Sequence, residues 1–402
     1  MLTHAGCVER RNRLWEHLPA SVEWVLVADP RHVYYLSGFL VQPLSFSVNE
    51  RGWLLLERNG PTTLLADNFT RRSALAAPFV DVEELEPWYD HKHSVINRDH
   101  ALLAALARVA PRLRSRQGVI EGHWLPVLAG ELVPTGSSRF TAGSGAVGTL
   151  GDLLKTLRRN KHADEIATLE QAMRACAAGH SAALATVRPG VTEFDVYRAI
   201  HAGVLAQAEK PVQIYGDFRS TNAETPKRGG APTDYVLQAG DLYLLDYSVI
   251  VDGYRSDFTN TVCAGEPSVD QRRLFDLCVE ALAAGESSLR AGVPAVSVYR
   301  ATAAPLRASP FGETFTHHAG HGLGMAHPEP PILVADSTDV LEAGDVVTLE
   351  PGLYVPGIGG IRLEHNYLIT ETGSRRLSPH RLALENSQQA DSFDIPLEPS
   401  TS

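Results

Sequence analysis

Two carboxylates are spaced as neighbours on a β-hairpin near the middle of the chain. Asp246 and Asp257 occupy strand-like runs on either side of Asp252-Gly253, a dipeptide that is typical of a two-residue hairpin turn. Strand pairing about this turn places Asp246 opposite Thr259, and it places Asp257 two residues away on the same face. The sequence therefore predicts that the two carboxylates are diagonal neighbours across the hairpin.

A second pair of acidic residues follows the same pattern. Glu350 and Glu364 flank a Pro/Gly turn with the even spacing that puts both side chains on one face of a hairpin. The segments that precede the two hairpins are also alike, because residues 187–200 and 289–302 agree at seven of fourteen positions at a constant offset of 102. We interpret this as a duplicated unit of helices and a hairpin, whose two copies pack around a shared sheet with pseudo-twofold symmetry. The alternative is a chance match between two helix starts.

These four carboxylates would repel one another in a partly buried site unless positive charge lies between them. Two divalent metal ions would balance the four charges, and a pair of ions held by bridging carboxylates is a known hydrolytic device. The histidine-rich segment 317–331 can supply an imidazole as a fifth ligand. Four oxygens and one nitrogen form a hard ligand set, which favours Mn²⁺, with Co²⁺ and Zn²⁺ as alternatives. Each acidic residue taken alone could instead be a solvated strand residue.

The elements in the first part of the chain alternate between strands and helices. Short apolar strands are predicted over residues 22–29, 52–57 and 62–67, and a helix over residues 100–114. This alternation indicates a small α/β domain. The Gly/Ser-rich segment 134–148 is the best linker candidate after it.

The linker places the domain boundary near residue 150. The first domain then covers residues 1–150, the second covers residues 151–385, and residues 386–402 form a polar tail. Long helices separated by strand-rich segments dominate the second domain. They are predicted over residues 162–187, 193–208, 269–290 and 295–308.

Composition and charge exclude several classes of protein. The chain carries 36 basic and 47 acidic side chains, and the net charge of −11 offers a nucleic acid backbone little positive charge. Apolar runs never approach the length of a membrane span, and the charged N-terminal segment is unlike a signal peptide. The 4 cysteines form no CxxC pair and are too sparse for a disulfide scaffold. We therefore expect a cytoplasmic protein without nucleic acid or membrane partners.

The order of the motifs resembles a known family. D-x10-D, H-G-x-G, T-x-E-P-G-x-Y and G-x-R-x-E are similar to the motifs of the dinuclear pita-bread metallopeptidases, which include prolidase, aminopeptidase P and methionine aminopeptidase. The segment RPGVTEFDVY resembles the family's RPGMTE, and LRRNKHADEI resembles its LR-x-IKS-x-x-EI. Upstream, RHVYYLSGF is similar to a motif of the creatinase-type N-terminal domain, which methionine aminopeptidases normally lack. The resemblance implies an α/β creatinase-like domain followed by an α+β pita-bread domain, in the proline-directed branch.

The resemblance also implies roles for individual residues. Glu350 would accept the proton of a water that bridges two metal ions, and Asp257 and Glu364 would bridge the ions. Arg362, His317 and Tyr354 match positions that line the site in relatives. They could instead be an ion-pair partner, a satisfied core imidazole and a packed ring. The implied metal ligands are Asp246, Asp257, His321, Glu350 and Glu364.

The chain departs from the family pattern at two positions. Gly229 and Pro328 stand where relatives carry histidines that hold the substrate or steady the intermediate. We hypothesise that His327 reaches the site from one position earlier, and that Arg228 binds the substrate carboxylate. The alternative for Arg228 is a solvated loop residue.

The resemblance points to prolidase activity, the hydrolysis of Xaa-Pro dipeptides by metal-activated water. Aminopeptidase P, which cuts longer Xaa-Pro peptides with the same metals, is the closest alternative. Ectoine hydrolase, which acts on a cyclic amide, and a catalytically silent pita-bread binding protein are further alternatives. A homodimer is expected, because the partner's N-terminal domain often closes the cleft in this family. In the loop over residues 40–51, Gln42 and Arg51 are then candidates for gripping a terminal carboxylate.

Overall fold

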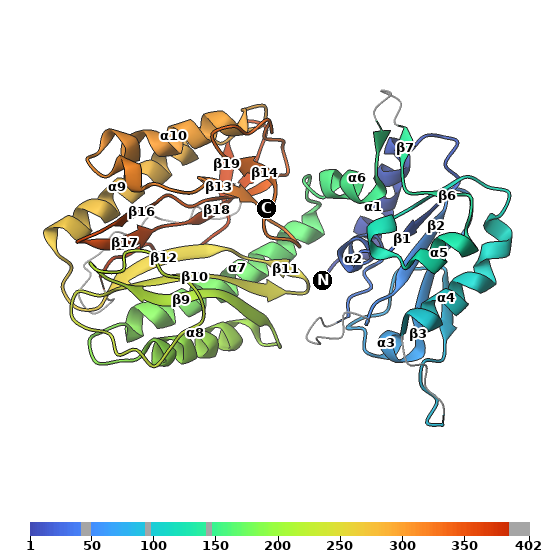
Figure 1. The fold of residues 1–402 in the computed structure, drawn as a ribbon, viewed down its shortest axis with the longest axis horizontal. Coiled ribbons are helices and arrows are strands. Elements are labelled where there is room, and N and C mark those ends of the chain that lie inside the picture. The colour runs from blue at the N-terminus through green and yellow to red at the C-terminus, as the bar shows by residue number, and fades with distance from the viewer. Residues whose placement is uncertain (42–49, 93–97, 142–146, 386–402) are drawn as a thin grey trace. The chain divides into compact units, whose positions relative to one another are not determined.

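The computed structural model describes residues 1–41, 50–92, 98–141 and 147–385. It divides into two compact units, Met1–Thr168 and Leu169–Ser402, and each has its own sheets (Figure 1). The predicted domain boundary near residue 150 lies inside the first unit and stays a prediction. Gln42 and the predicted tail over residues 386–402 lie outside the described residues.

The first unit is built on a six-stranded mixed sheet, as an α/β domain requires. In spatial order the sheet contains β4 (Val82–Glu86), β3 (Thr62–Asp67), β2 (Trp53–Glu57), β1 (Trp24–Val27), β5 (Gly118–Ile120) and β6 (Gly136–Ser137). Strands β1, β2 and β3 are buried along their whole length, which explains why the sequence there is a run of apolar residues rather than an alternation.

Helices and short elements complete this unit. Helix α4 (Arg98–Val109) covers the first ten residues of the helix predicted over 100–114, and a 3-10 turn over Ala110–Leu113 follows it. The apolar face of α4 includes Leu102 and Leu106, which pack in the core with Trp24 and Trp53. The helices are α1 (His4–His17), α2 (Pro30–Ser37), α3 (Asn68–Arg72), α4 (Arg98–Val109), α5 (Val127–Leu132) and α6 (Leu150–Leu157), with a small ribbon of β7 (Phe140–Thr141) and β8 (Val147–Gly148).

The second unit consists of two successive sets of helices and strands. Helix α7 (Ala163–Thr186) crosses the division between the units and is followed by α8 (Glu193–Ala208), β9 (Gln213–Thr221), β10 (Leu242–Val251), β11 (Tyr254–Arg255) and β12 (Phe258–Cys263). The second set contains α9 (Val269–Glu286), α10 (Ala295–Ala308), β13 (Gly320–Gly322), β14 (Glu329–Leu333), β15 (Val346–Leu349), β16 (Gly352–Val355), β17 (Gly359–Arg362), β18 (His365–Ile369) and β19 (Ser374–Arg376). All four helices run close to their predicted spans, alongside the strands (Figure 1).

The backbone confirms that the two sets are a duplication. Gly190 and Gly292 precede the second helix of each set, and both have positive φ angles, of 88° and 81°. Each is followed by an isolated antiparallel bridge, Thr192 to Val236 in the first set and Pro294 to Val340 in the second. Matching backbone conformations that L side chains rarely adopt are poorly explained by a chance match. The alternative of two unrelated helix starts is therefore rejected.

Three buried histidines lie together in the second unit. His180 of helix α7 stacks on the ring of Tyr247, and its ring centroid lies 4.8 Å from that of His380, which in turn lies 4.6 Å from that of His365. Burial lowers the pKa of His180 to about 3. The His180 imidazole is therefore neutral in the folded protein near pH 6.5, where the same imidazole in the unfolded chain begins to bind a proton.

This burial predicts a loss of stability in mild acid. The contribution of neutral His180 is fully present above about pH 6.5 and is lost as the pH falls from there toward the folded-state value of about 3. Between pH 7 and pH 5 the loss is about 2 kcal/mol of unfolding free energy for this one group. Urea unfolding followed by far-ultraviolet circular dichroism should show that His180→Phe removes this part of the pH dependence. An unchanged slope of stability against pH would contradict the prediction.

Candidate metal centre and active site

The predicted hairpins are present, and they bring together acidic residues from both halves of the second unit. In the first half, Asp246 of β10 lies opposite Thr259 of β12, as the turn predicted. In the second half, Leu349 at the end of β15 pairs with His365 at the start of β18. Glu350 directly follows Leu349, and Glu364 directly precedes His365. The acidic pairs therefore lie at comparable places in the two hairpins.

Three of the carboxylates form a tight group. One oxygen each of Asp246, Asp257 and Glu364 can be chosen so that all lie within 4.8 Å of one another. Burial raises the pKa of Asp246 to about 6, to which the charges of Asp257 and Glu350 contribute and which Arg362 opposes. Burial and the same neighbouring carboxylates raise the pKa of Glu364 well above its usual range. Both shifts have the direction expected where negative charge is gathered without a cation.

His321 completes the group from strand β13. Its Nδ1 lies 2.9 Å from the carbonyl oxygen of Gly322, to which Nδ1–H donates, so Nε2 is the nitrogen that faces the carboxylates. Nε2 lies 3.5 Å from Oδ2 of Asp257 and 3.4 Å from Oε1 of Glu350. A lone pair directed at two carboxylate oxygens is repulsive unless a proton or a metal ion lies between them.

The residues present fit a divalent metal centre. A buried Oε1 of Glu364 has no hydrogen-bond partner among the described residues, and the side chain lies beside two further carboxylates, those of Asp246 and Asp257. Hard oxygen donors with one imidazole suit divalent cations, and a fixed tautomer orients the imidazole for binding. The sequence-predicted ligands thus lie together, and what the geometry offers is a carboxylate and histidine site for divalent ions.

Hydroxyl and amide groups around the carboxylates fix their orientation. Thr259 Oγ1 donates to Oε2 of Glu364 over 2.7 Å, and Thr348 Oγ1 donates to Oε1 of Glu350 over 3.3 Å. The backbone N–H of Asp257 donates to the side-chain carbonyl of Asn366 over 3.1 Å. Such outer partners hold ligand side chains in place.

Arg362, Tyr354 and His317 form a chain of contacts beside the carboxylates. The Arg362 guanidinium pairs with Asp246 and donates to the Tyr354 hydroxyl over 2.8 Å, and that hydroxyl lies 3.2 Å from Nε2 of His317. Burial lowers the pKa of His317 to about 4, and it raises that of Tyr354 to about 12. A neutral imidazole, a neutral phenol and one guanidinium therefore line this side of the site.

His327 lies at the site, as the sequence hypothesis required. Its Nε2 is 2.8 Å from Oδ2 of Asp257, and this hydrogen bond raises the pKa of His327. Arg228 is half-buried in the loop after β9, and its neighbour Lys227 contacts Tyr354, one of the residues beside the carboxylates. Lys227 Nζ lies 4.9 Å from the centroid of the Tyr354 ring. The role suggested for Arg228 in substrate binding stays a prediction.

Sequence reasoning missed two residues of the site. His318 Nε2 lies 3.0 Å from Oε1 of Glu350, and this hydrogen bond raises the pKa of His318. Its place in the histidine-rich segment was the signal that could have found it. Asp217 of β9 lies directly across from Asp246, with its Oδ2 4.0 Å from a guanidinium nitrogen of Arg362. The sequence carries no motif that marks it.

Arg51, suggested from the sequence as a grip for a terminal carboxylate, already has a partner within its own unit. Its guanidinium lies 2.8 Å from a carboxylate oxygen of Asp99. Within the part of the chain that the structure describes, no helix combines the length and apolar character that crossing a membrane demands.

Both units of the chain match known protein families. Residues 167–371 match metallopeptidase family M24, and residues 10–134 match the creatinase/prolidase N-terminal domain. The uncharacterized peptidase YqhT of Bacillus subtilis is 31% identical over 237 residues, which cover 58% of this chain and 67% of that protein. An uncharacterized peptidase of Staphylococcus aureus is 27% identical over 363 residues, covering 88% of this chain and 93% of its own.

Solved structures share the fold over almost the whole chain. An Xaa-Pro dipeptidase from Bacillus anthracis has a TM-score of 0.72 at 22% identity and covers 95% of this chain and 99% of its own. An X-Pro aminopeptidase from Thermotoga maritima has the same TM-score, 0.72, at 19% identity, with 93% and 99% covered. The creatinase-like α/β domain and the duplicated pita-bread domain expected from the sequence are thereby confirmed. The chain belongs to metallopeptidase family M24 and is a peptidase.

Proposed function

We propose that the protein hydrolyses the Xaa-Pro bond of dipeptides with two divalent ions, of which Mn²⁺ suits the ligand set best. The observation that carries the proposal is the meeting of Asp246, Asp257, His321, Glu350 and Glu364, which come from both halves of the duplication. The match of residues 10–134 to the creatinase/prolidase N-terminal domain favours the proline-directed branch of the family.

The metal ions would supply Lewis acidity and a lowered pKa for a water molecule. Glu350 is the group that takes up the proton. Burial acts to raise its pKa, but the hydrogen bond from His318 and the nearby His321 hold it below the ordinary value, so Glu350 is ionised at neutral pH. An ionised carboxylate that is fixed by Thr348 and His318 can accept a proton and then give it to the departing proline nitrogen.

The remaining residues would bind the substrate and stabilise charge that develops on it. The peptide bond before proline is a tertiary amide and has no N–H, so an enzyme cannot hold it through that group. Arg362 offers N–H donors beside the carboxylates instead, and its hydrogen bond to the Tyr354 hydroxyl, which in turn donates to Nε2 of His317, holds it in place. His327 adds an imidazole next to Asp257, to which its Nε2 is hydrogen-bonded. Such preorganised donors act on charge that develops during the reaction.

Metal removal tests this function. Protein stripped with a chelator is expected to lose turnover of Ala-Pro, and added Mn²⁺ is expected to restore it more fully than Co²⁺ or Zn²⁺. Ions that bind the folded state alone also raise the melting temperature, so thermal unfolding of the stripped and reloaded protein gives a readout without substrate. Full activity of the stripped protein in excess chelator would overturn the metal-dependent mechanism.

Substrate length separates prolidase activity from its closest alternative. Ala-Pro, Ala-Pro-Ala and Ala-Ala should be compared on the Mn²⁺-loaded protein. Turnover of Ala-Pro alone supports a dipeptidase, and preferred turnover of Ala-Pro-Ala supports an aminopeptidase P. Absence of turnover with all of these peptides, in a protein that binds metal, would favour a cyclic amide substrate or a silent binding protein.

We also propose that the protein is a homodimer, in which the N-terminal domain of one subunit closes the site of the other. Sedimentation of the purified protein tests the assembly. A monomer at micromolar concentration with full dipeptidase activity would exclude a contribution of the partner to the site.

A further inference from the structure

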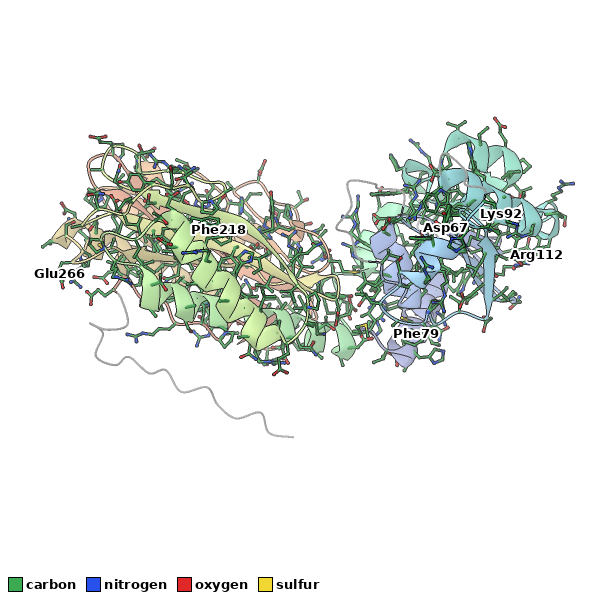
Figure 2. All side chains as sticks on the ribbon, turned by 90° about the horizontal axis from the view of Figure 1, so that it is seen from below. Asp67, Phe79, Lys92, Arg112, Phe218 and Glu266 are labelled. Atoms are coloured by element: carbon green, nitrogen blue, oxygen red, sulfur yellow. The ribbon has the colours of Figure 1, made fainter. Side chains whose placement is uncertain are left out.

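Asp217 faces the site from strand β9. Its neighbour Phe218, labelled in Figure 2, is buried against the ring of Tyr197 from helix α8 and the ring of Tyr247 from strand β10. Successive side chains of a strand point to opposite faces, so Asp217 points away from the helices. It shares that face with its cross-strand partner Asp246, one of the predicted metal ligands.

The duplication gives Asp217 a counterpart in the second half. Gly216 and Gly320 have φ angles of 155° and 157°, and each presses against the backbone carbonyl of a central strand. A Cβ atom added at Gly216 would lie 2.2 Å from the carbonyl oxygen of Asp246, and one added at Gly320 would lie 2.0 Å from that of Thr348. The residue after Gly320 is His321, and the residue after Gly216 is Asp217. Asp217 therefore occupies in the first half the place that a predicted metal ligand has in the second.

The carboxylate of Asp217 is held in place but is not enclosed. The backbone N–H of Gly230 donates to its Oδ1 over 2.6 Å, while 38% of the side chain is exposed. The neighbouring residue, Gly229, has no side chain, and a Cβ atom there would lie 2.8 Å from Oδ2 of Asp217. Gly229 thus leaves room for the Asp217 carboxylate. A histidine side chain at position 229 would have to displace that carboxylate. Asp217 is therefore a solvent-accessible anion beside the predicted metal ligand Asp246.

Two cations close to Asp217 are engaged by other carboxylates. Arg219, two residues along the strand, lies 3.1 Å from a carboxylate oxygen of the buried Glu193. Arg362 is 4.0 Å from Asp217 and pairs with Asp246. The charge of Asp217 is therefore available to a cation that enters from solvent.

We propose that Asp217 makes the site selective for substrates whose first residue carries a positive charge, such as Lys-Pro and Arg-Pro. This inference rests on the proposed hydrolysis of Xaa-Pro dipeptides. Proline contributes no cationic group, and every substrate has the same α-amino group. A carboxylate in the wall can therefore discriminate among dipeptides only through a basic side chain of the first residue. Asp217 is thus a specificity-determining residue.

The test compares Lys-Pro with Met-Pro, whose side chain is unbranched, of similar length and uncharged. A part-exposed ion pair is expected to favour Lys-Pro by roughly fivefold in kcat/KM, mostly through KM, and added salt should reduce the preference. Asp217→Asn should bring the ratio of the two substrates close to one. Asp276→Asn, which removes the same charge from an exposed position of helix α9, should keep the wild-type ratio.

Other roles of Asp217 give different results. If Asp217 only positions Arg362 or the loop at Gly230, Asp217→Asn slows both substrates equally and the ratio stays at its wild-type value, which overturns the proposal. If it is a further metal ligand, metal content falls and the ratio again stays constant. If no dipeptide is hydrolysed, the proposed function fails. Calorimetry of Lys-Pro and Met-Pro binding to the metal-loaded wild type and Asp217→Asn then still tests the selectivity.

Discussion

Replacement of Glu350 by glutamine is expected to lower kcat for Ala-Pro by about 10³-fold, because a general base typically contributes a factor of this size. Glutamine preserves the shape of the side chain, and its carbonyl oxygen can still accept the hydrogen bonds from His318 and Thr348. It cannot accept a proton from a water molecule at neutral pH. It also removes one of the negative charges that would hold the metal ions. Steady-state kinetics and metal analysis of the same preparation measure the two effects separately.

Glu313→Gln is the matched control for this variant, because Glu313 is an exposed residue outside the predicted site. It should keep wild-type kcat and metal content. A Glu350→Gln protein that retained more than about a tenth of the wild-type kcat, with its metal in place, would mean that another group takes up the proton. His318 is then the first candidate, because it lies next to Glu350.

Local sequence patterns were sufficient for the hairpins that carry the acidic residues. The Asp252-Gly253 turn fixes the register of β10 and β12, and this register alone determines that Asp246 lies opposite Thr259. The pairing around Glu350 and Glu364 follows in the same way from the second turn. Both predictions concern residues that are close in the chain, so few arrangements had to be considered.

Residues that approach from other elements could not be placed in this way. Asp217 meets Asp246 only because β9 pairs with β10 across a loop of 20 residues between them, and no turn motif fixes that register. The contact between Lys227 and Tyr354 depends on where a long loop lies over the other half of the domain. The sequence suggested Arg228 from its charge and did not suggest Lys227, because charge type is visible in a sequence and the direction of a loop side chain is not.

The largest effect on stability is expected in the first unit, at the buried pair of Arg10 and Asp164. Arg10 is fully buried, and its guanidinium lies 2.8 Å and 3.1 Å from the two carboxylate oxygens of Asp164. It also donates to the backbone carbonyl of Tyr35 over 2.7 Å. Asp164→Ala removes the nearer of two carboxylates that face this buried charge and leaves Glu165, whose Oε2 lies 3.6 Å from the guanidinium, so it is expected to cost about 3 kcal/mol of unfolding free energy.

Tryptophan fluorescence during urea unfolding measures this loss in the intact protein, because all 5 tryptophans of the chain lie in the first unit. Arg71→Met provides the comparison, since it breaks the part-exposed pair of Arg71 and Glu83 and should cost less than about 1 kcal/mol.

The double variant Arg10→Met with Asp164→Leu decides what the buried pair contributes. If the damage in Asp164→Ala comes from a poorly compensated charge, removing both charges restores most of the lost stability, because apolar side chains of similar volume need no partner and Glu165 keeps the hydrogen bond from the backbone N–H of His162. If the double variant is as unstable as Asp164→Ala, the hydrogen bonds from Thr3 to Asp164 and from Arg10 to Tyr35 are what hold this part of the unit together. The charge of the pair then has little effect on folding, and the prediction of a charge-driven loss is wrong.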